Sequence, residues 1–167
     1  ATVRVSGPDA YAIVSKIFAP VRQGKSVADA KGYTAMLGHY LLHEVEMDEC
    51  VALFFRAPHS YTGEDTVELS LHGGVYLLRR TLRALYAAGA RPAEAGEFTR
   101  RAFENGKIDL SGAEAVMSLI AADGSLAAKT ALAAKEGSVF RRLDGVKSAL
   151  LATAAQFSAF VDYPDDD

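Results

Sequence analysis

The sequence predicts a mixed α/β (α+β) domain followed by the first helices of an all-α domain. Alternating apolar patterns typical of strands occur only in the first 105 residues, where they are mixed with helical patterns. Beyond Gly106 only Ala-rich helical patterns remain. Hydrophobic residues make up 50% of the chain and charged residues 23%, which is typical of a globular core. We therefore expect an N-terminal α/β domain over residues 1–105 and the start of a helical domain over residues 106–167.

The first elements are predicted from a change of period. Residues 1–5 alternate, with Val3 and Val5 on one face, which is typical of a half-buried strand. Ser6 or Gly7 can cap a helix that has Pro8 at its first position. The apolar stripe of this helix consists of Ile13, Val14, Ile17 and Phe18. Residues 20–32 are rich in turn-forming residues and are predicted to form a loop.

Three further strands are expected in the middle of the chain. Residues 33–42 and 50–55 are predicted to be strands joined by an acidic turn at residues 47–49, and a Pro/Ser/Gly loop follows. In the strand over residues 65–72 the apolar side chains alternate with polar ones. One face has Val67, Leu69 and Leu71, and the other has Thr66, Glu68, Ser70 and His72.

Helices account for most of the rest. A helix from Gly74 to about Ala87 is predicted, with Gly89 as its C-terminal cap. Its inward residues are Val75, Leu78, Leu82 and Leu85, whereas Arg79, Arg80 and Arg83 are predicted to form a solvated face. An extended piece over residues 90–93 precedes a helix over 94–104. A Ser-x-x-Glu capping box at Ser111 and Glu114 then begins helices that run to about Val161, with breaks near Gly124 and Gly137.

The composition excludes several classes of protein. A net charge of -3 argues against a free-standing polyanion-binding protein. No apolar run reaches the roughly 20 residues needed to cross a bilayer, and no secretory signal is evident. Cys50 is the single cysteine, which fits a reducing compartment, so a cytoplasmic location is expected. The chain opens in a strand pattern and closes directly after a helical one, so we expect it to belong to a larger protein.

Two common types of site are weakly indicated. The stretch "APVRQGKS", residues 19–26, matches a permissive P-loop pattern. It is expected not to bind phosphate, because the segment before it is predicted to be helical and Gly32 follows Lys25 too soon for a helix. The four histidines, His39, His43, His59 and His72, lack the spacing of a metal site, although His39 and His43 could share a strand face. No Ser-His-Asp signature is evident either.

The polar strand faces are the better candidates. Arg4 and Glu68 both lie on the polar side of their strands. Two interpretations stay open: a solvated sheet face, or a site for a ligand with donors at one end and anionic groups at the other. Lys107, directly after the Asn105-Gly106 break, could serve the anionic end. Arg100 and Arg101 could equally be surface residues, since Glu97 precedes Arg101 by four positions, a spacing typical of a helical ion pair.

Four blocks resemble the MnmE (TrmE) family of tRNA modification GTPases: "VRVSGPDA", "APHSYTGEDTVELSLHGG", "GARPAEAGEFTRRAFENGKIDLSGAEAV" and "DYPDDD". The resemblance covers nearly the whole chain, but only the family's N-terminal domain and the opening of its central helical domain. The GTPase domain, the rest of the helical domain, the Cys-containing tail and the Gly-rich stretch before Arg4 are absent. Smaller departures from the family pattern occur at Glu104 and at Ser111-Gly112.

The resemblance implies a fold similar to tetrahydrofolate-binding domains of the aminomethyltransferase type, and a homodimer. It also implies a folate site at Arg4, Glu68 and Lys107, for 5-formyltetrahydrofolate or 5,10-methylenetetrahydrofolate as one-carbon donor. With the flavoprotein MnmG (GidA), the family modifies C5 of the wobble uridine of tRNA. GTP hydrolysis, with magnesium and potassium, belongs to the absent domain, so this chain is expected to lack catalytic residues and GTPase activity.

The implied ligand agrees with the chemistry of these residues. A pterin presents an N–H and an amino group side by side, which a carboxylate such as Glu68 can accept together. The carboxylates of the folate tail require Arg or Lys. Two other functions stay open: a stand-alone folate-dependent enzyme of the aminomethyltransferase kind, for which His72 is the one evident general acid or base, and a dimerisation scaffold without a ligand.

Overall fold

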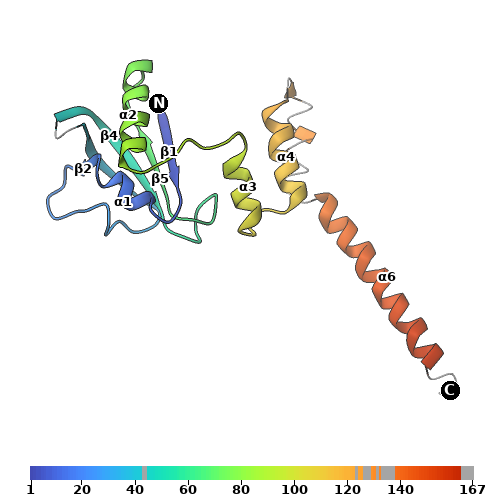
Figure 1. Cartoon of the computed structure of the whole chain (residues 1–167). Coiled ribbons are helices and arrows are strands. Elements are labelled where there is room, and N and C mark those ends of the chain that lie inside the picture. The colour runs from blue at the N-terminus through green and yellow to red at the C-terminus, as the bar shows by residue number, and fades with distance from the viewer. Residues whose placement is uncertain (43–44, 123, 126–128, 131, 133–137, 163–167) are drawn as a thin grey trace. The chain divides into compact units, whose positions relative to one another are not determined.

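The chain forms two compact units. The structure is a computed structural model that describes residues 1–42, 45–122, 124–125, 129–130, 132 and 138–162. The units comprise Ala1–Lys107 and Ile108–Asp167. The predicted domain boundary after residue 105 lies two residues before this division, and the assignment of the units as domains stays a prediction. Among the described residues all strands belong to the first unit, which confirms the mixed α+β class (Figure 1).

The first unit is built on a five-stranded antiparallel sheet. Its strands lie in the order β1-β5-β4-β3-β2, so that β1 and β2 are the edges. The strands are β1 (Thr2–Ser6), β2 (Phe18–Pro20), β3 (Thr34–Leu42), β4 (Val45–Phe55) and β5 (Thr66–Ser70). The segments predicted to alternate, residues 1–5 and 65–72, contain strands β1 and β5, which the structure pairs as antiparallel neighbours.

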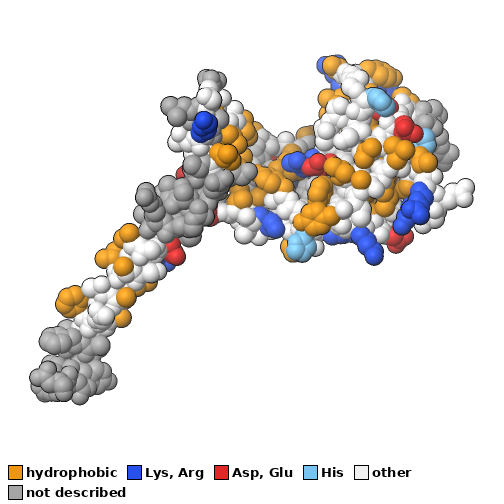
Figure 2. Space-filling model, turned by 180° about the vertical axis from the view of Figure 1, so that it is seen from behind, with side chains coloured by type: hydrophobic (Ala, Val, Ile, Leu, Met, Phe, Trp, Pro, Cys, Tyr) orange, Lys and Arg blue, Asp and Glu red, His pale blue; other side chains and the backbone are white. Residues whose placement is uncertain are grey.

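The two faces of the sheet differ in chemistry. On the core face, Val5, Val67 and Phe54 are buried in cross-strand register and pack with residues of α1 (Ala10–Val14) and α2 (Val75–Ala88). The opposite face, which we call the open face, carries the Arg4–Glu68 pair and the exposed pair Leu37 and Val51, among others. Figure 2 shows hydrophobic side chains among charged ones on the side of the first unit turned away in Figure 1.

Helix α2 ends as predicted. Gly89 adopts a left-handed conformation (φ 117°), and its N–H donates to the last turn of the helix. The backbone of Ala90 also donates to the carbonyl oxygen of Leu85 at 2.9 Å, which closes the turn. One residue at the other end of the helix was predicted wrongly: Val75 is exposed rather than inward, because it lies in the first turn.

The largest departure from the prediction lies between β1 and β3. Helix α1 covers only Ala10–Val14, with Asp9 rather than Ser6 or Gly7 at its N-cap and with Pro8 before it. The expected apolar stripe continues instead into strand β2, where Phe18 packs against Phe54 in the core. Residues 47–49, predicted to form an acidic turn, lie within β4, and His43 lies outside the described residues.

The remaining helices begin or end at other residues than expected. They are α3 (Glu97–Glu104), α4 (Leu110–Ile120) and α6 (Ser138–Asp162). Ser111 is not a cap, because the Asp109 carboxylate accepts from the N–H of Gly112 at 2.6 Å and the helix begins one residue before Ser111. Gly137 lies outside the described residues. None of the described helices combines the length and the hydropathy needed to cross a membrane.

Candidate functional site

Arg4 and Glu68 form an ion pair on the open face, between the edge strand β1 and its neighbour β5. The Nε of Arg4 donates to Oε1 of Glu68 at 2.6 Å. Ala1 and Leu71 exchange both backbone hydrogen bonds, so the pairs alternate along the two strands and Arg4–Glu68 is a non-hydrogen-bonded pair. Side chains of such pairs lie closest together, so the strand register itself holds the guanidinium against the carboxylate.

Two aromatic rings lie beside this pair. The guanidinium carbon of Arg4 lies 5.5 Å from the ring centre of Phe98 and 5.8 Å from that of Tyr61. The hydroxyl of Tyr61 shares a hydrogen bond with the hydroxyl of Thr99 (3.1 Å), which joins the loop to α3. The side chain of Arg4 is 41% exposed and that of Glu68 is 19% exposed, so a ligand could reach both.

Tyr61 belongs to the 56–65 loop, which connects β4 to β5 and is fixed at its base by Arg56. This side chain donates to the carbonyl oxygens of Ala28 and Ala30, at 2.5 and 3.1 Å. It also donates to Asp65 at 2.9 Å, and its guanidinium lies 3.6 Å from the ring centre of Tyr11. The loop is therefore held by contacts with distant parts of the chain, which no local pattern indicates.

The far side of the loop is held by β1 and by the end of α3. The hydroxyls of Thr62 and Ser6 share a hydrogen bond of 2.6 Å, and Asn105 donates to the carbonyl oxygen of Thr62 at 2.8 Å. Lys107 donates from Nζ to the carbonyl oxygen of Pro58 at 2.9 Å. These contacts tie both ends of the predicted site to one loop.

The close approach of Lys107 to the loop requires glycine at position 63. Gly63 has φ +80°, and a Cβ there would lie 3.1 Å from the Cβ of Asn105 and 3.2 Å from the Cγ of Lys107. Gly106 also adopts the left-handed conformation (φ +67°), and the N–H of Lys107 donates to Ala102 at 2.8 Å. The break at Asn105-Gly106 thus turns Lys107 back against the loop.

Of the three predicted site residues, the structure brings two into contact. Arg4 and Glu68 are bonded directly, whereas Lys107 forms no hydrogen bond or ion pair with either of them, in a region where all three are described. Lys107 shares with Arg4 only its contact with the 56–65 loop, through Pro58 and Tyr61 respectively.

Only one pair of a second ionic cluster, Glu97 with Arg101, was anticipated from the sequence. Both oxygens of Glu97 accept from Arg91, Oε2 also accepts from the N–H of Glu94, and Oε1 lies 3.1 Å from Nε of Arg101. The hydrogen bonds from Arg91, then the one from Glu94, lower the pKa of Glu97 to about 2. Arg101 also pairs with Glu64 at 2.7 Å. The expected surface pair is therefore part of a network around a carboxylate that is only 4% exposed.

The other candidate residues have structural partners or lie at the surface. The ring Nδ1 of His72 shares a hydrogen bond with the Asp48 carboxylate (2.7 Å), and the backbone N–H of His72 donates to the same carboxylate (2.9 Å). Arg100 makes exposed ion pairs with Glu94 and Glu104. Within the described part of the chain no three His, Cys, Asp or Glu residues gather as they would around a metal.

The P-loop-like stretch was rejected partly for a wrong reason. The stretch begins within strand β2 (Phe18–Pro20), so a strand and not a helix leads into it. No helix follows Lys25 and Ser26, however, and the hydroxyl of Ser26 bonds the Asp29 side chain at 2.7 Å. A phosphate cradle needs a helix N-terminus after the lysine, so the second reason still applies.

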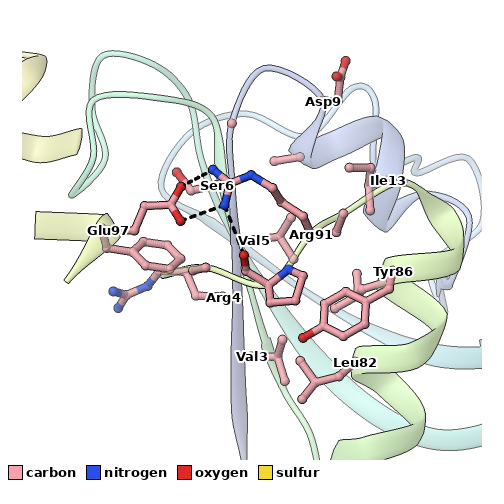
Figure 3. Close-up of a pocket in the computed structure, with 18 of the residues that line it drawn as sticks. Val3, Arg4, Val5, Ser6, Asp9, Ile13, Leu82, Tyr86, Arg91 and Glu97 are labelled. Carbon is pink, nitrogen blue, oxygen red and sulfur yellow. Dashed lines mark hydrogen bonds and ion pairs between the residues drawn. The ribbon is translucent and has the colours of Figure 1, made fainter. Parts of the chain in front are cut away.

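A cavity of about 610 Å³ runs along the outer side of β1 (Figure 3). It is lined by β1, by α1 and α2, and by the connection from Gly89 to Ala93. Arg91 and Glu97 lie at one end, and Leu82 and Tyr86 lie at the side. Arg4 and Phe98 line it, whereas Glu68 and Lys107 do not, so this cavity adjoins the predicted site at Arg4.

Comparison with known proteins decides the family. The family described as "GTP-binding protein TrmE N-terminus" matches residues 1–107, which are also the residues of the first unit. The chain belongs to the TrmE family. Proteins named "tRNA modification GTPase MnmE" are similar to it over nearly its full length, with 40% identity in Bacteroides thetaiotaomicron, 43% in Parabacteroides distasonis and 44% in Thermus thermophilus.

The chain is much shorter than the relatives it matches. The alignments cover 98–99% of this chain but only 36–37% of those three TrmE-family relatives. The predicted resemblance to the N-terminal region of this family is thereby confirmed. What the longer relatives do as whole proteins is taken up below as a proposal.

Proposed function

We propose that this chain is the N-terminal part of a tRNA modification GTPase, and that its first unit binds a reduced folate on the open face of the sheet. Family membership and the names of the relatives support the first part. The observation that carries the second is the Arg4–Glu68 pair, which is partly exposed, flanked by two aromatic rings and placed on a face that also exposes the apolar side chains of Leu37 and Val51.

Glu68 has the capacity to read a pterin. A carboxylate offers about four acceptor positions, and Arg4 occupies one of them. The adjacent N–H and amino groups of a pterin would use two more. Because the Glu68 carboxylate is hydrogen-bonded to Arg4, its orientation is fixed before the ligand binds. The bound folate would supply a one-carbon unit, as 5-formyl- or 5,10-methylenetetrahydrofolate.

Lys107 would serve the anionic part of the ligand. Its ammonium has three donors and gives one to the carbonyl oxygen of Pro58. Two donors stay available for a carboxylate, and the left-handed Gly106 fixes the backbone from which the side chain extends. Arg4 and Lys107 would then bind folate groups at different distances from the pterin.

Calorimetric titration of the chain with 5-formyltetrahydrofolate tests this proposal. Removing a charged partner from a desolvated site costs about 2 to 5 kcal/mol, so Glu68→Ala should weaken binding at least tenfold. Glu104→Ala is the matched control, because Glu104 is an exposed carboxylate outside the proposed site. Equal affinities of Glu68→Ala and the parent chain would refute the role of Glu68, and no measurable binding by the parent would refute the folate site.

We also propose that the first unit forms a homodimer through the open face. Leu37 and Val51 are opposite each other on neighbouring strands and are both exposed, and Tyr33 extends this apolar surface. Leu37→Glu should convert a dimer into a monomer in sedimentation at micromolar concentration. Val75→Glu, at an exposed apolar residue on α2, should leave the dimer intact. A parent chain that sediments as a monomer would refute the dimer.

The relatives' names support a proposal for the activity of the whole protein. We propose that GTP, magnesium and potassium are used by a domain outside these residues, and that MnmG (GidA) and tRNA are partners of the whole protein. The chain itself should not turn over GTP, since no helix follows Lys25. Sustained hydrolysis that disappears in Lys25→Ala would overturn this.

A complete folate enzyme is the weaker candidate. The His72–Asp48 pair resembles an oriented general base, since Nδ1 is bonded to the carboxylate and Nε2 is the other ring nitrogen. His72 follows Glu68 by four residues along an extended chain, however, which is roughly 13 Å at strand spacing. Within the described residues no contact joins His72 to Arg4 or Glu68, because its ring is bonded to Asp48 instead.

A further inference from the structure

We propose that the outer face of α2 binds the phosphate backbone of RNA. This face carries Arg79, Arg80 and Arg83 beside the exposed ring of Tyr76, and we call it the arginine face. The choice of RNA as the anion rests on the proposed function, since the relatives are named tRNA modification GTPases. The surface itself follows from the charges and contacts of α2.

The arginines of α2 lack the carboxylate partners that other arginines of the first unit have. Elsewhere in this unit five arginines form ion pairs: Arg4–Glu68, Arg56–Asp65, Arg91–Glu97, Arg100–Glu94 and Arg101–Glu64. Within the described part of the chain, Arg79, Arg80 and Arg83 form no ion pair. Residues 69–93 contain no Asp or Glu, although the chain has 21 such residues, so no acidic side chain of α2 or of its flanking segments balances the three charges.

The stability of the helix does not explain this arrangement. Arg79 and Arg83 are four residues apart, so their like charges destabilise the helix. Positive charge stabilises a helix at its C-terminal end, but the last turn of α2 has no basic residue. Both arginines are exposed. The cavity along β1 is lined by another flank of the helix, which includes Leu78, Leu82 and Leu85. The arginine face is therefore available to an anion outside the fold.

The spacing and chemistry of the arginines suit phosphate groups. A guanidinium donates to phosphate oxygens through two parallel N–H groups and keeps its charge at every physiological pH. Arg79 and Arg83 are separated by about 6 Å along the helix axis, so each can bind a different phosphate of one strand. Lys16 adds a charge at the C-terminal end of α2, where its Nζ donates to the carbonyl oxygen of Ala88 at 2.8 Å. Positive charge thus continues along the helix.

The surroundings of the arginines favour RNA over an anionic membrane or an acidic protein. Tyr76 is 67% exposed, and its ring centre lies 5.8 Å from the guanidinium carbon of Arg80. An exposed ring among arginines can stack with a nucleobase, which acidic side chains do not provide. A helix that lies in a membrane inserts an apolar face, whereas the leucines of α2 pack against the core of the first unit.

Fluorescence anisotropy with a labelled RNA hairpin tests the proposal on this chain. At about 50 mM KCl the parent should bind with a Kd of roughly 1 to 100 µM, the range of sequence-independent contacts. Arg79→Gln combined with Arg83→Gln should weaken binding at least tenfold. The slope of log Kd against log salt should fall by about 1.4 to 1.8, because each lost phosphate contact removes about 0.7 to 0.9. No binding by the parent at that salt concentration would refute the proposal.

Arg22→Gln combined with Lys25→Gln is the matched control. This variant removes the same charge from exposed residues between β2 and β3, so it should weaken RNA binding less than twofold and leave the salt slope unchanged. Equal losses in the two double variants would show that net charge decides binding, and would overturn the proposal. Tighter binding of the parent to a polyglutamate peptide, or to vesicles that contain phosphatidylserine, than to RNA would also overturn it.

Two further measurements separate this proposal from the folate site. The Arg79→Gln and Arg83→Gln variant should bind 5-formyltetrahydrofolate as the parent does and should keep its urea midpoint, because the loss of two like charges does not weaken the helix. A midpoint that falls together with RNA affinity would mean that the arginines act through the fold. Folate binding without RNA binding would refute the RNA surface alone. RNA binding without folate binding would refute the folate site alone.

Discussion

Two arginine–glutamate pairs in the first unit use the same chemistry for different ends. Glu97 is almost completely buried and accepts two hydrogen bonds from Arg91, one from Glu94 and a contact from Arg101, which fills the roughly four acceptor positions of a carboxylate. Glu68 accepts one bond, from Arg4, and both side chains are partly exposed. A carboxylate whose acceptor positions are all occupied within the chain stabilises the fold. A carboxylate with unoccupied acceptor positions can also bind a ligand.

The position of each pair in the fold explains the difference. Arg91 lies in the extended connection between α2 and α3, so its bonds to Glu97 and the bond from Glu94 close a local turn at the start of α3. Arg4 and Glu68 instead stand opposite each other on a sheet that is already held by backbone hydrogen bonds. Glu97 thus fixes a connection that has no β-sheet hydrogen bonds of its own, whereas the β1–β5 pairing does not depend on Glu68.

The largest effect is expected from Glu97→Ala. The substitution leaves Arg91 and Arg101 without their shared acceptor and removes the acceptor for the N–H of Glu94. Among single charge removals in the first unit, it should cause the greatest fall in the urea midpoint, measured by circular dichroism. Glu68→Ala should change the free energy of unfolding by about 0 to 1 kcal/mol, as partly exposed pairs do. Similar losses from both variants would end the distinction between the two pairs.

Acid titration should show the same effect as a function of pH. The pKa of Glu97 is about 2 in the folded chain, against an ordinary value of 4.5. Because the folded pKa is the lower one, the stabilisation by Glu97 is complete above about pH 4.5 and is lost as pH falls toward 2. The difference in urea midpoint between the parent and Glu97→Gln should therefore shrink over this interval. A difference that is constant from pH 6 to pH 2 would show that the charge of Glu97 does not matter.

The ligand side of the comparison is tested by Arg4→Ala. We expect 5-formyltetrahydrofolate to bind roughly tenfold more weakly, about 1.4 kcal/mol, because Glu68 loses the side chain that orients it. The urea midpoint should stay near that of the parent, because the β1–β5 backbone ladder is unchanged. Loss of affinity accompanied by an equal loss of stability would mean that Arg4 acts through the fold alone.

Residues with local signals were predicted well. The period of two placed Arg4 and Glu68 on the polar faces of their strands, and the period of 3.6 with Gly89 placed α2 and its end. That the two strands are neighbours is shown by the structure alone. The errors occur where a tertiary contact overrides a local pattern. Phe18 continues a helical stripe by spacing but joins the sheet as β2, and Asp109, two residues before the expected cap, takes the capping bond.

The residues that build the site region could not be read from the sequence. Arg56 contacts carbonyl oxygens 26 and 28 residues away, and Arg91 reaches Glu97 across six residues of non-helical chain. Neither spacing is typical of any element. The Glu97–Arg101 spacing did give a signal for the ionic cluster, but it could not show that Glu97 is buried, because burial depends on how the connection folds back.

The smallest effect is expected from Arg100→Ala, which marks the lower limit of the comparison. Arg100 neighbours the buried cluster in sequence, but its pairs with Glu94 (3.3 Å) and Glu104 (3.8 Å) join side chains that are all more than half exposed. Exposed helical pairs contribute about 0.3 to 0.5 kcal/mol, and salt screens them. Arg100→Ala should therefore lower the urea midpoint only slightly, and less still when 0.5 M salt is added. Arg101→Ala should lower the midpoint clearly both with and without the added salt. The reason is that Arg101 contacts Glu97, Glu64 and the carbonyl oxygen of Ser6. Equal shifts of the urea midpoint for these adjacent arginines would contradict this comparison. They would mean that the number of hydrogen bonds to a carboxylate and its burial do not decide which charged residues stabilise the fold.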